Sequence, residues 1–290
     1  MKLLDLFAGI GGFSLGMEQA GCETIAFCEC NEWCIENALQ VNWPGIPVYR
    51  NIAELCRRIH HNLNETGQDY DGDYVECSIH GVDFGECPCI GTDQFLDEHG
   101  APDIITAGVP CQPASLIGKR GGRDDSRWLW PDTLRVIEEL GPTWVVFEQP
   151  PGILSLDRGD RFRDILHRLH AAGFDVWWET LPATAVGAGH RRERVFIIAH
   201  ARSARLEGHA RYGAKQGQAV THRPVASPSV FPARHSGAWW KDQSPVPIVV
   251  DGVPDYAFWK QAIIATGNAV VPAIPEVIAH AIRETSCLDT

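Results

Sequence analysis

The chain has 290 residues, a formal net charge of −12, 44% hydrophobic residues and 21% charged residues. This length can bury a full core and form one large domain with a smaller one, and the composition is ordinary for a globular protein. The N-terminus lacks a signal-peptide pattern and charge, Gly or Pro interrupts every long apolar stretch, so we expect a cytoplasmic protein without membrane contact. The ten cysteines are then expected to be reduced thiols.

Positive charge is concentrated between His190 and Asp242, which hold ten Lys or Arg against three Asp or Glu. The net charge of this segment is +7, against −19 for the remainder. The negative charge of the remainder argues against a protein that binds nucleic acid with its whole surface, but it leaves room for binding by one basic face. The asymmetry indicates a clamp for a polyanion, with a solvated basic loop as the alternative.

The first residues predict a strand (Lys2 to Phe7), a glycine-rich turn (Ala8 to Gly12) and a helix (Phe13 to Ala20). This order opens the nucleotide-binding half of a doubly wound α/β sheet, where glycines let the backbone approach a cofactor. The spacing is G-x-G-G and not G-x-G-x-x-G, so a dinucleotide is not the expected ligand.

The second predicted strand, Glu23 to Cys28, ends at Glu29. A carboxylate in this place can accept hydrogen bonds from both hydroxyls of a ribose. We interpret Cys28 and Cys30 as packing residues. A helix (Glu32 to Gln40) and a third short strand (Pro47 to Tyr49) follow.

Residues 60–101 read as an insertion that has no helical period after about Leu63. It holds three thiols and one imidazole within thirteen residues, namely Cys77, His80, Cys87 and Cys89. Such a set can bind a tetrahedral structural zinc, although C-x-C is an unusual spacing for one. The alternative is a loop with free thiols.

The segment from Asp103 to Ser115 predicts a buried strand (Ile104 to Thr106) that delivers a loop at its carboxyl end. Ligands bind at that edge of open α/β sheets. Cys111 stands between Pro110 and a second proline two residues on, and this stiff backbone suits a nucleophile. A small buried hydrophobe is the alternative.

The rest of the chain repeats the pattern of helix and strand. A strand from Thr143 to Phe147 delivers Glu148, which would lie beside the strand that carries Cys111 and would allow acid-assisted thiol addition. We further expect helices at Trp128–Leu140, Arg161–Ala172, Tyr256–Ala265 and from the GNAVVP segment to about Glu284, and strands at Phe174–Leu181 and Arg194–Ala199.

With these pieces in order, the chain resembles the cytosine-C5 DNA methyltransferases of the bacterial or phage kind. The matching segments are DLFAGIGGFSLG (5–16), Glu29, GVPCQPAS (108–115), FEQPPGIL (147–154), HRRERVFIIA (190–199) and GNAVVP (267–272). They span nearly the whole length of the chain, and PCQ together with GNAVVP is specific.

The resemblance implies a Rossmann-like, doubly wound, mostly parallel sheet in residues 1–200 plus 256–290, with a small target-recognition region in 201–255. The C-terminal helix would return beside the first strand. The implied cofactor is S-adenosylmethionine, which would become S-adenosylhomocysteine. Its implied binding residues are Phe7, Ala8, Gly9, Gly11, Gly12, Glu29, Asn51, Ile52, Pro110, Asn268 and Ala269.

The resemblance also implies the chemistry. Cys111 would attack C6 of a flipped cytosine, Glu148 would stabilise the protonated ring, Arg194 would reach the cytosine or its phosphate, and Arg192 would support the loop. The partner would be double-stranded DNA, a restriction endonuclease would be the functional counterpart, and the chain would be a monomer. The implied DNA-binding residues are Gln112, Ser115, Lys119, Arg120, Arg123 and Arg191.

Two departures from the family pattern leave alternatives open. Gln149-Pro150 stands where relatives have Asn-Val, so the amide that braces the Pro-Cys loop is one methylene longer. His190 replaces the usual Gln. A weakly active or inactive cofactor- and DNA-binding protein, and an RNA cytosine methyltransferase, are therefore the rival interpretations.

Overall fold

The computed structural model describes residues 1–55, 58–63, 69–77, 91–110, 128–202, 261 and 264–288. Several predictions concern residues outside this set. They are Cys111 and the segment after it (Gln112, Ser115, Lys119, Arg120 and Arg123), three members of the Cys/His group (His80, Cys87 and Cys89), and the region 203–260.

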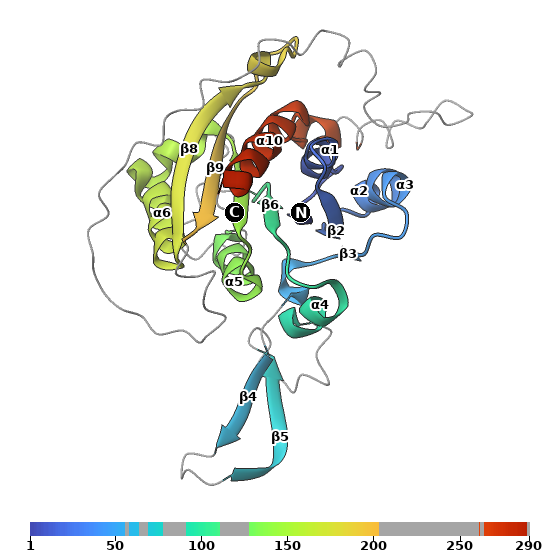
Figure 1. Ribbon diagram of the computed structural model, residues 1–290, viewed down its shortest axis with the longest axis vertical. Helices are drawn as coiled ribbons and strands as arrows, with labels where there is room; N and C mark the ends of the chain where they lie inside the picture. Colours follow the sequence, from blue (N-terminus) through green and yellow to red (C-terminus); the bar gives the residue numbers. More distant parts are fainter. Residues whose placement is uncertain are drawn as a thin grey trace.

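A seven-stranded sheet forms the centre of the molecule, in the order β3-β2-β1-β6-β7-β9-β8 (Figure 1). Neighbouring strands are parallel from β3 to β7, and β9 is antiparallel to both β7 and β8. The chain builds outward from β1 to β3 and then returns to the other side of β1, so the order reverses between β1 and β6. The strands are β1 (Lys2–Leu6), β2 (Glu23–Cys28), β3 (Val48–Tyr49), β6 (Ile104–Ala107), β7 (Trp144–Gln149), β8 (Phe174–Pro182) and β9 (Glu193–Ala201). This confirms the predicted mostly parallel, doubly wound fold.

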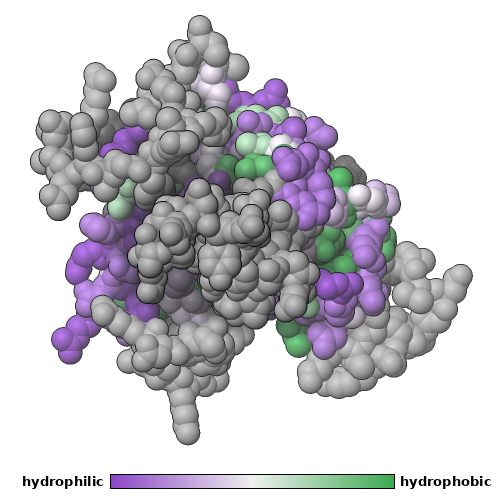
Figure 2. All heavy atoms as spheres, turned by 90° about the horizontal axis from the view of Figure 1, so that it is seen from below, coloured by the Kyte–Doolittle hydropathy of each residue, from purple (hydrophilic) through white to green (hydrophobic). Residues whose placement is uncertain are grey.

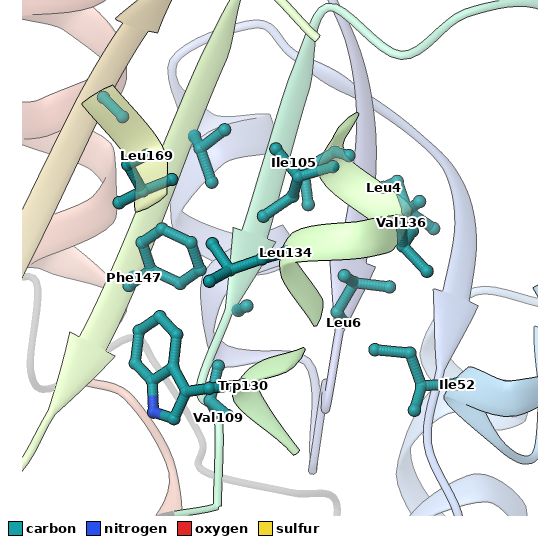
Figure 3. Close-up of a cluster of buried hydrophobic side chains, with 14 of the residues drawn as sticks. Leu4, Leu6, Ile52, Ile105, Val109, Trp130, Leu134, Val136, Phe147 and Leu169 are labelled. Carbon is teal, nitrogen blue, oxygen red and sulfur yellow. The ribbon is translucent and has the colours of Figure 1, made fainter. Parts of the chain in front are cut away.

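Helices cover both faces of the sheet because successive strand residues alternate between two apolar clusters. Leu4, Leu6 and Phe147 face one cluster, together with α5 (Trp130–Leu140) and α6 (Asp160–Ala171). Figure 3 shows Ile105 and Phe147 of the strands turned toward Leu134, and Trp130 beside Val109. None of the helices among the described residues is long and apolar enough to cross a membrane.

The opposite cluster joins the two ends of the chain. Leu3 packs there with α1 (Gly12–Gln19) and α10 (Ala273–Leu288), which lie side by side in Figure 1. The C-terminal helix therefore returns beside the first strand, as the resemblance implies. α10 continues to Leu288, past the predicted end at Glu284. The helix that was predicted to end at Ala265 continues to residue 268.

Residues 60–101 were predicted to have no helical period after about Leu63, and this prediction was wrong for residues 92–99. An antiparallel pair, β4 (Arg58–Leu63) and β5 (Asp69–Cys77), forms a separate two-stranded sheet, and α4 (Thr92–His99) follows. The strands are rich in polar residues on both alternating positions, which hides the period of two. In α4, Phe95 is fully buried and packs against Tyr49. The helix has only eight residues, too few apolar ones among them to show a helical period in the sequence.

Smaller helical segments complete the chain. A run with a π-helical centre comprises α2 (Glu32–Cys34), η1 (Ile35–Leu39) and α3 (Gln40–Asn42), and the 3-10 segments are η2 (Ile52–Glu54), η4 (Pro151–Gly159) and η5 (Ala183–Val186). On the face shown in Figure 2, hydrophilic residues make up most of the described surface. Among the residues that the structure describes, the exposed large hydrophobic side chains lie on different elements, except for two tryptophans of β8: Leu15, Val41, Leu154, Trp177, Trp178 and Ile264.

Gly16 allows the close contact between α1 and the start of α10. A Cβ atom at this position would lie 2.1 Å from the Pro272 carbonyl oxygen. We expect Gly16→Ala to lower the free energy of unfolding by about 1–3 kcal/mol, because backbone atoms must move to relieve the overlap. The measurement is urea denaturation followed by circular dichroism. Gly189→Ala is the matched control, because nothing lies within 4 Å of its added Cβ; equal losses in both variants would contradict this account.

Candidate active site

Three parallel strands end together at one edge of the sheet. Leu6 of β1 is in register with Ala107 of β6, and Ala107 is in register with Phe147 of β7. The next residue along each chain segment is therefore a neighbour of the other two. Phe7 follows β1 and opens the glycine-rich turn, Gly108 follows β6 and leads toward Pro110, and Glu148 is the last residue but one of β7. This edge lies at the point where the strand order reverses, the usual ligand site of open α/β sheets.

Asp5, a residue of β1, holds the glycine-rich turn in place through hydrogen bonds to α1 and β6. Its side chain is fully buried, and it accepts hydrogen bonds from Thr106 Oγ1 at 2.8 Å and from Ser14 Oγ at 2.9 Å and backbone N at 3.3 Å. Gly11 is the N-cap of α1 and has no side chain, so Asp5 supplies the acceptor that the first helical turn needs. Burial raises the pKa of Asp5 from 3.8 to about 7, although these hydrogen bonds oppose the shift.

Glu29 joins the end of β2 to the turn. Its Oε2 accepts from Gly9 N and its Oε1 from Asn31 N, each at 2.7 Å. Each carboxylate oxygen keeps a further lone pair, so Glu29 is held in place and still able to accept ribose hydroxyls. Gly11 has a φ of +83°, and a Cβ there would lie 2.5 Å from the Trp43 ring. Both the backbone conformation and the lack of space therefore favour glycine at this position.

The predicted pair at the end of β3 is only partly exposed. Asn51 is exposed, and its Oδ1 accepts from Ala53 N at 3.0 Å, so the amide caps η2. Ile52 is buried in the core. Of the two cysteines interpreted as packing residues, Cys28 is buried as predicted, but Cys30 is exposed, so that prediction was wrong for Cys30.

Glu148 lies in a buried ion pair. Arg194 Nε is 2.8 Å from Glu148 Oε1, and only a small part of the carboxyl is exposed. Burial raises the pKa of Glu148, while Arg194 and then Arg192 oppose the rise. The carboxyl is thus a group that holds a proton more readily than an exposed glutamate, and an arginine fixes its orientation.

Arg192 connects the start of β9 to the C-terminal segment. It donates to the carbonyl oxygens of Gly267 at 2.6 Å and Ala269 at 2.9 Å. Val270 of the same segment approaches α1 so closely that a Cβ on Gly12 would lie 2.6 Å from its carbonyl oxygen. The structure thereby brings Gly12, Ala269 and Arg192 to one place, with Asn268 exposed beside them.

Gln149 braces the segment that leads to Cys111. Its side chain is fully buried, and Nε2 donates to the Val109 carbonyl oxygen at 2.8 Å. The additional methylene relative to Asn therefore does not prevent the brace. Trp130, 4.9 Å from Phe147 between ring centroids, packs in the same cluster as Val109.

Not every predicted residue joins this site. Arg191 is exposed and pairs with Glu193 at 2.8 Å. Of the predicted zinc ligands, the structure describes only Cys77, as the last residue of β5, and the described residues contain no group of three or more potential metal ligands. Sequence reasoning missed Asp5, although a lone acid inside the apolar run LLDLF is the signal that marks it.

An open parallel sheet, a glycine-rich turn at its reversal point and a carboxylate after the second strand together define the Rossmann-like methyltransferase class. Residues 1–65 and 80–230 match the family described as C-5 cytosine-specific DNA methylase. The chain belongs to this family.

Several curated proteins similar to this chain are Type II methyltransferases. The Type II methyltransferase M.HgiCII of Herpetosiphon aurantiacus is 31% identical over 198 residues, which cover 68% of this chain and 36% of the relative. M.BsuFI of Bacillus subtilis is 29% identical over 68% of this chain and 39% of its own length. The chain thus matches less than half of the length of either relative.

A solved structure of a putative DNA modification methyltransferase encoded within an E. coli prophage aligns with a TM-score of 0.50 and 23% identity. The alignment covers 70% of this chain and 47% of that protein, and it supports the fold.

Asp5 generates a pH prediction. Because its pKa is higher in the folded chain, Asp5 stabilises the fold most below pH 3.8, and this contribution falls as the pH rises to about 7. The difference in unfolding free energy between wild type and Asp5→Asn should therefore decrease over that range, by on the order of 4 kcal/mol, and then stay constant. Chemical denaturation at several pH values measures it, with the exposed Asp164→Asn as the control for loss of one acid. A difference that does not change with pH would show that Asp5 titrates normally.

Proposed function

We propose that this chain is a DNA (cytosine-5-)-methyltransferase that transfers a methyl group from S-adenosylmethionine to C5 of cytosine. The observation that carries the proposal is the position of Glu148. It is a buried carboxyl with a raised pKa, it is oriented by Arg194 at 2.8 Å, and it lies near the end of β7, the strand next to the one that leads to Cys111.

The chemistry requires these two groups together. C5 of cytosine is a weak nucleophile until another group adds to C6 and turns the ring into an enamine. In the proposed reaction the Cys111 thiolate forms the bond to C6, and Glu148 gives its proton to N3, so the electron pair moves toward C5. Burial, which raises the pKa of Glu148, favours uptake of a proton by this carboxyl, and Arg194 stabilises the carboxylate that remains after the transfer.

The same residues complete the cycle. After C5 has gained the methyl group, a base removes the C5 proton, N3 returns its proton to Glu148, and the bond between C6 and Cys111 breaks. The thiolate is thereby restored. Gln149 keeps the cysteine segment in place through the Val109 carbonyl, which limits the positions that Cys111 can take relative to Glu148.

The turn at residues 7–12 and Glu29 fit the proposed cofactor. Glu29 is held by two backbone N–H groups and keeps acceptor sites for ribose hydroxyls, and the glycines allow close approach of the backbone. Asn51, Pro110 and Asn268 border the same edge. When bound there, S-adenosylmethionine supplies an electrophilic methyl group. Asn51 Oδ1 already caps η2, so its Nδ2 is the group that is left for an adenine.

We infer that double-stranded DNA is the substrate and that the target cytosine is flipped into the site, because the reacting atoms of a stacked base cannot reach Glu148. Residues 201–255 would form the target-recognition region, and residues 1–200 with 256–290 the catalytic domain. The positive charge of residues 190–242 would hold the phosphate backbone. The Type II names of the relatives support a restriction endonuclease as counterpart, and we infer that the chain acts as a cytoplasmic monomer.

The decisive experiment measures transfer of tritiated methyl from S-adenosylmethionine to unmethylated genomic DNA and, separately, to total RNA. We expect label on DNA, with bisulfite sequencing placing it on cytosines within a short motif. Cys111→Ser should abolish transfer and retain cofactor binding, and Glu148→Gln should reduce the rate by about 100-fold or more. Label on RNA alone would replace the proposal with an RNA cytosine methyltransferase. No label on either, with cofactor bound, would indicate a binding protein.

Gln149→Met tests the brace. Methionine has a similar length but no amide, so the buried Val109 carbonyl loses its donor. An unpaired buried carbonyl costs about 1–3 kcal/mol. If this cost raises the barrier of the reaction, kcat should fall by roughly 10- to 100-fold. The Kd for S-adenosylmethionine should stay within a factor of two, as measured by calorimetry. Ser155→Ala, at an exposed position nearby, is the control; an unchanged kcat in Gln149→Met would remove the brace from the mechanism.

A further inference from the structure

The segment between the catalytic acid and α6 contains an unusual turn. η4 begins two residues after Gln149, the last residue of β7, and α6 begins at Asp160, so the turn lies at the edge of the sheet where β7 ends. Ile153 is fully buried, and Leu156 packs against the same core cluster. Contacts between η4 and β9 place this segment beside the strand that carries Arg194.

Three successive residues of the turn have left-handed backbone conformations. The φ and ψ values are 49° and 44° for Asp157 and 61° and 25° for Arg158, and Gly159 has φ 87°. A residue other than glycine costs about 1–2 kcal/mol in this region, and two in a row persist only where the surroundings hold them. The chain accepts this cost at the edge of its active site.

Arg161 holds the turn in place. Its Nε lies 2.8 Å from Asp157 Oδ2, and its guanidinium lies 4.9 Å from the centre of the Trp128 ring. The Arg161 side chain is only 12% exposed. The ion pair and the cation–π contact together fix Asp157, and the adjacent Arg158 is left pointing away from the core as an exposed residue.

Arg158 differs in its partners from the other arginines of this edge. Arg161 pairs with Asp157, Arg191 with Glu193, and Arg194 with Glu148. Arg192 donates to two carbonyl groups. Within the part of the chain that the structure describes, Arg158 has no recorded partner. The nearby Asp160 is taken by Arg163 at 2.7 Å, and the exposed Asp164 lies one helical turn further along α6.

We propose that this turn presents Arg158 to a backbone phosphate of the DNA, next to the entrance for the target cytosine. The proposal rests on the proposed function, because it names a further binding residue of the same site. An exposed arginine without a competing acid forms a charge-assisted contact with phosphate at small desolvation cost. The strained turn holds it in position, so little conformational freedom is lost when DNA binds.

The test is DNA binding by the full chain as a function of salt concentration. A 30-base-pair duplex of unmethylated DNA that the wild type methylates serves as the probe, with fluorescence anisotropy as the readout. One phosphate contact contributes about 0.9 to the slope of log K against log salt, so Arg158→Gln should reduce the slope by about that amount and weaken binding roughly 3- to 10-fold. The rate at saturating DNA and the Kd for S-adenosylmethionine should not change.

Two variants separate charge from backbone. Arg158→Lys keeps the charge and should keep the wild-type slope, whereas Arg158→Gly relieves the left-handed strain and should raise the midpoint of denaturation while showing the reduced slope. Arg163→Gln is the matched control, since Arg163 is 76% exposed and pairs with Asp160; its slope should equal that of the wild type.

The outcomes distinguish this inference from the proposed function. If the wild type methylates DNA but Arg158→Gln has the wild-type slope, the inference is wrong and the function stands. A reduced slope in Arg163→Gln equal to that in Arg158→Gln also overturns it, because general charge would then explain the effect. If the wild type methylates no DNA, both proposals fail.

Discussion

The register of three parallel strands determines where every candidate group of this protein lies. Leu6, Ala107 and Phe147 are aligned across β1, β6 and β7, so the turn after β1, the segment before Cys111 and the Glu148 carboxyl emerge at one edge. A shift of one residue in β7 would turn Glu148 to the opposite face of the sheet, because side chains alternate along a strand. Strand pairing therefore determines which chemical groups can meet.

Two buried acids support this edge in different ways. Asp5 accepts three hydrogen bonds, and these connect β1 to β6 and to the first turn of α1. Glu148 has two arginines nearby, and its pKa is raised all the same because burial outweighs them. The first acid therefore positions the glycine-rich turn, and the second is a carboxyl whose burial favours its protonated form, at the end of the strand next to β6.

The local sequence was sufficient to predict most strands of the sheet, but it did not predict which side chains contact one another. β2 was predicted with its observed ends, and the order of elements from Trp128 to Ala201 follows directly from runs of apolar residues between glycines and charges. Three features depend on long-range contacts or on weak local patterns. Gln149 meets Val109 from another strand, Arg192 meets carbonyls at the far end of the chain, and β4, β5 and α4 carry too few apolar residues to show a period. Such contacts become visible only when the fold brings them together.

The C-terminal segment links the two halves of the candidate site. Arg192, which lowers the pKa of Glu148, also holds the carbonyls of Gly267 and Ala269, and Val270 packs onto Gly12 at the start of α1. A displacement of this segment would therefore move the arginine beside Glu148 and the helix that follows the glycine-rich turn at the same time. Since Gly12 and Gly16 both face backbone atoms of residues 270–272, neither can gain a side chain without separating them. The C-terminal segment thus helps to position both halves of the candidate site.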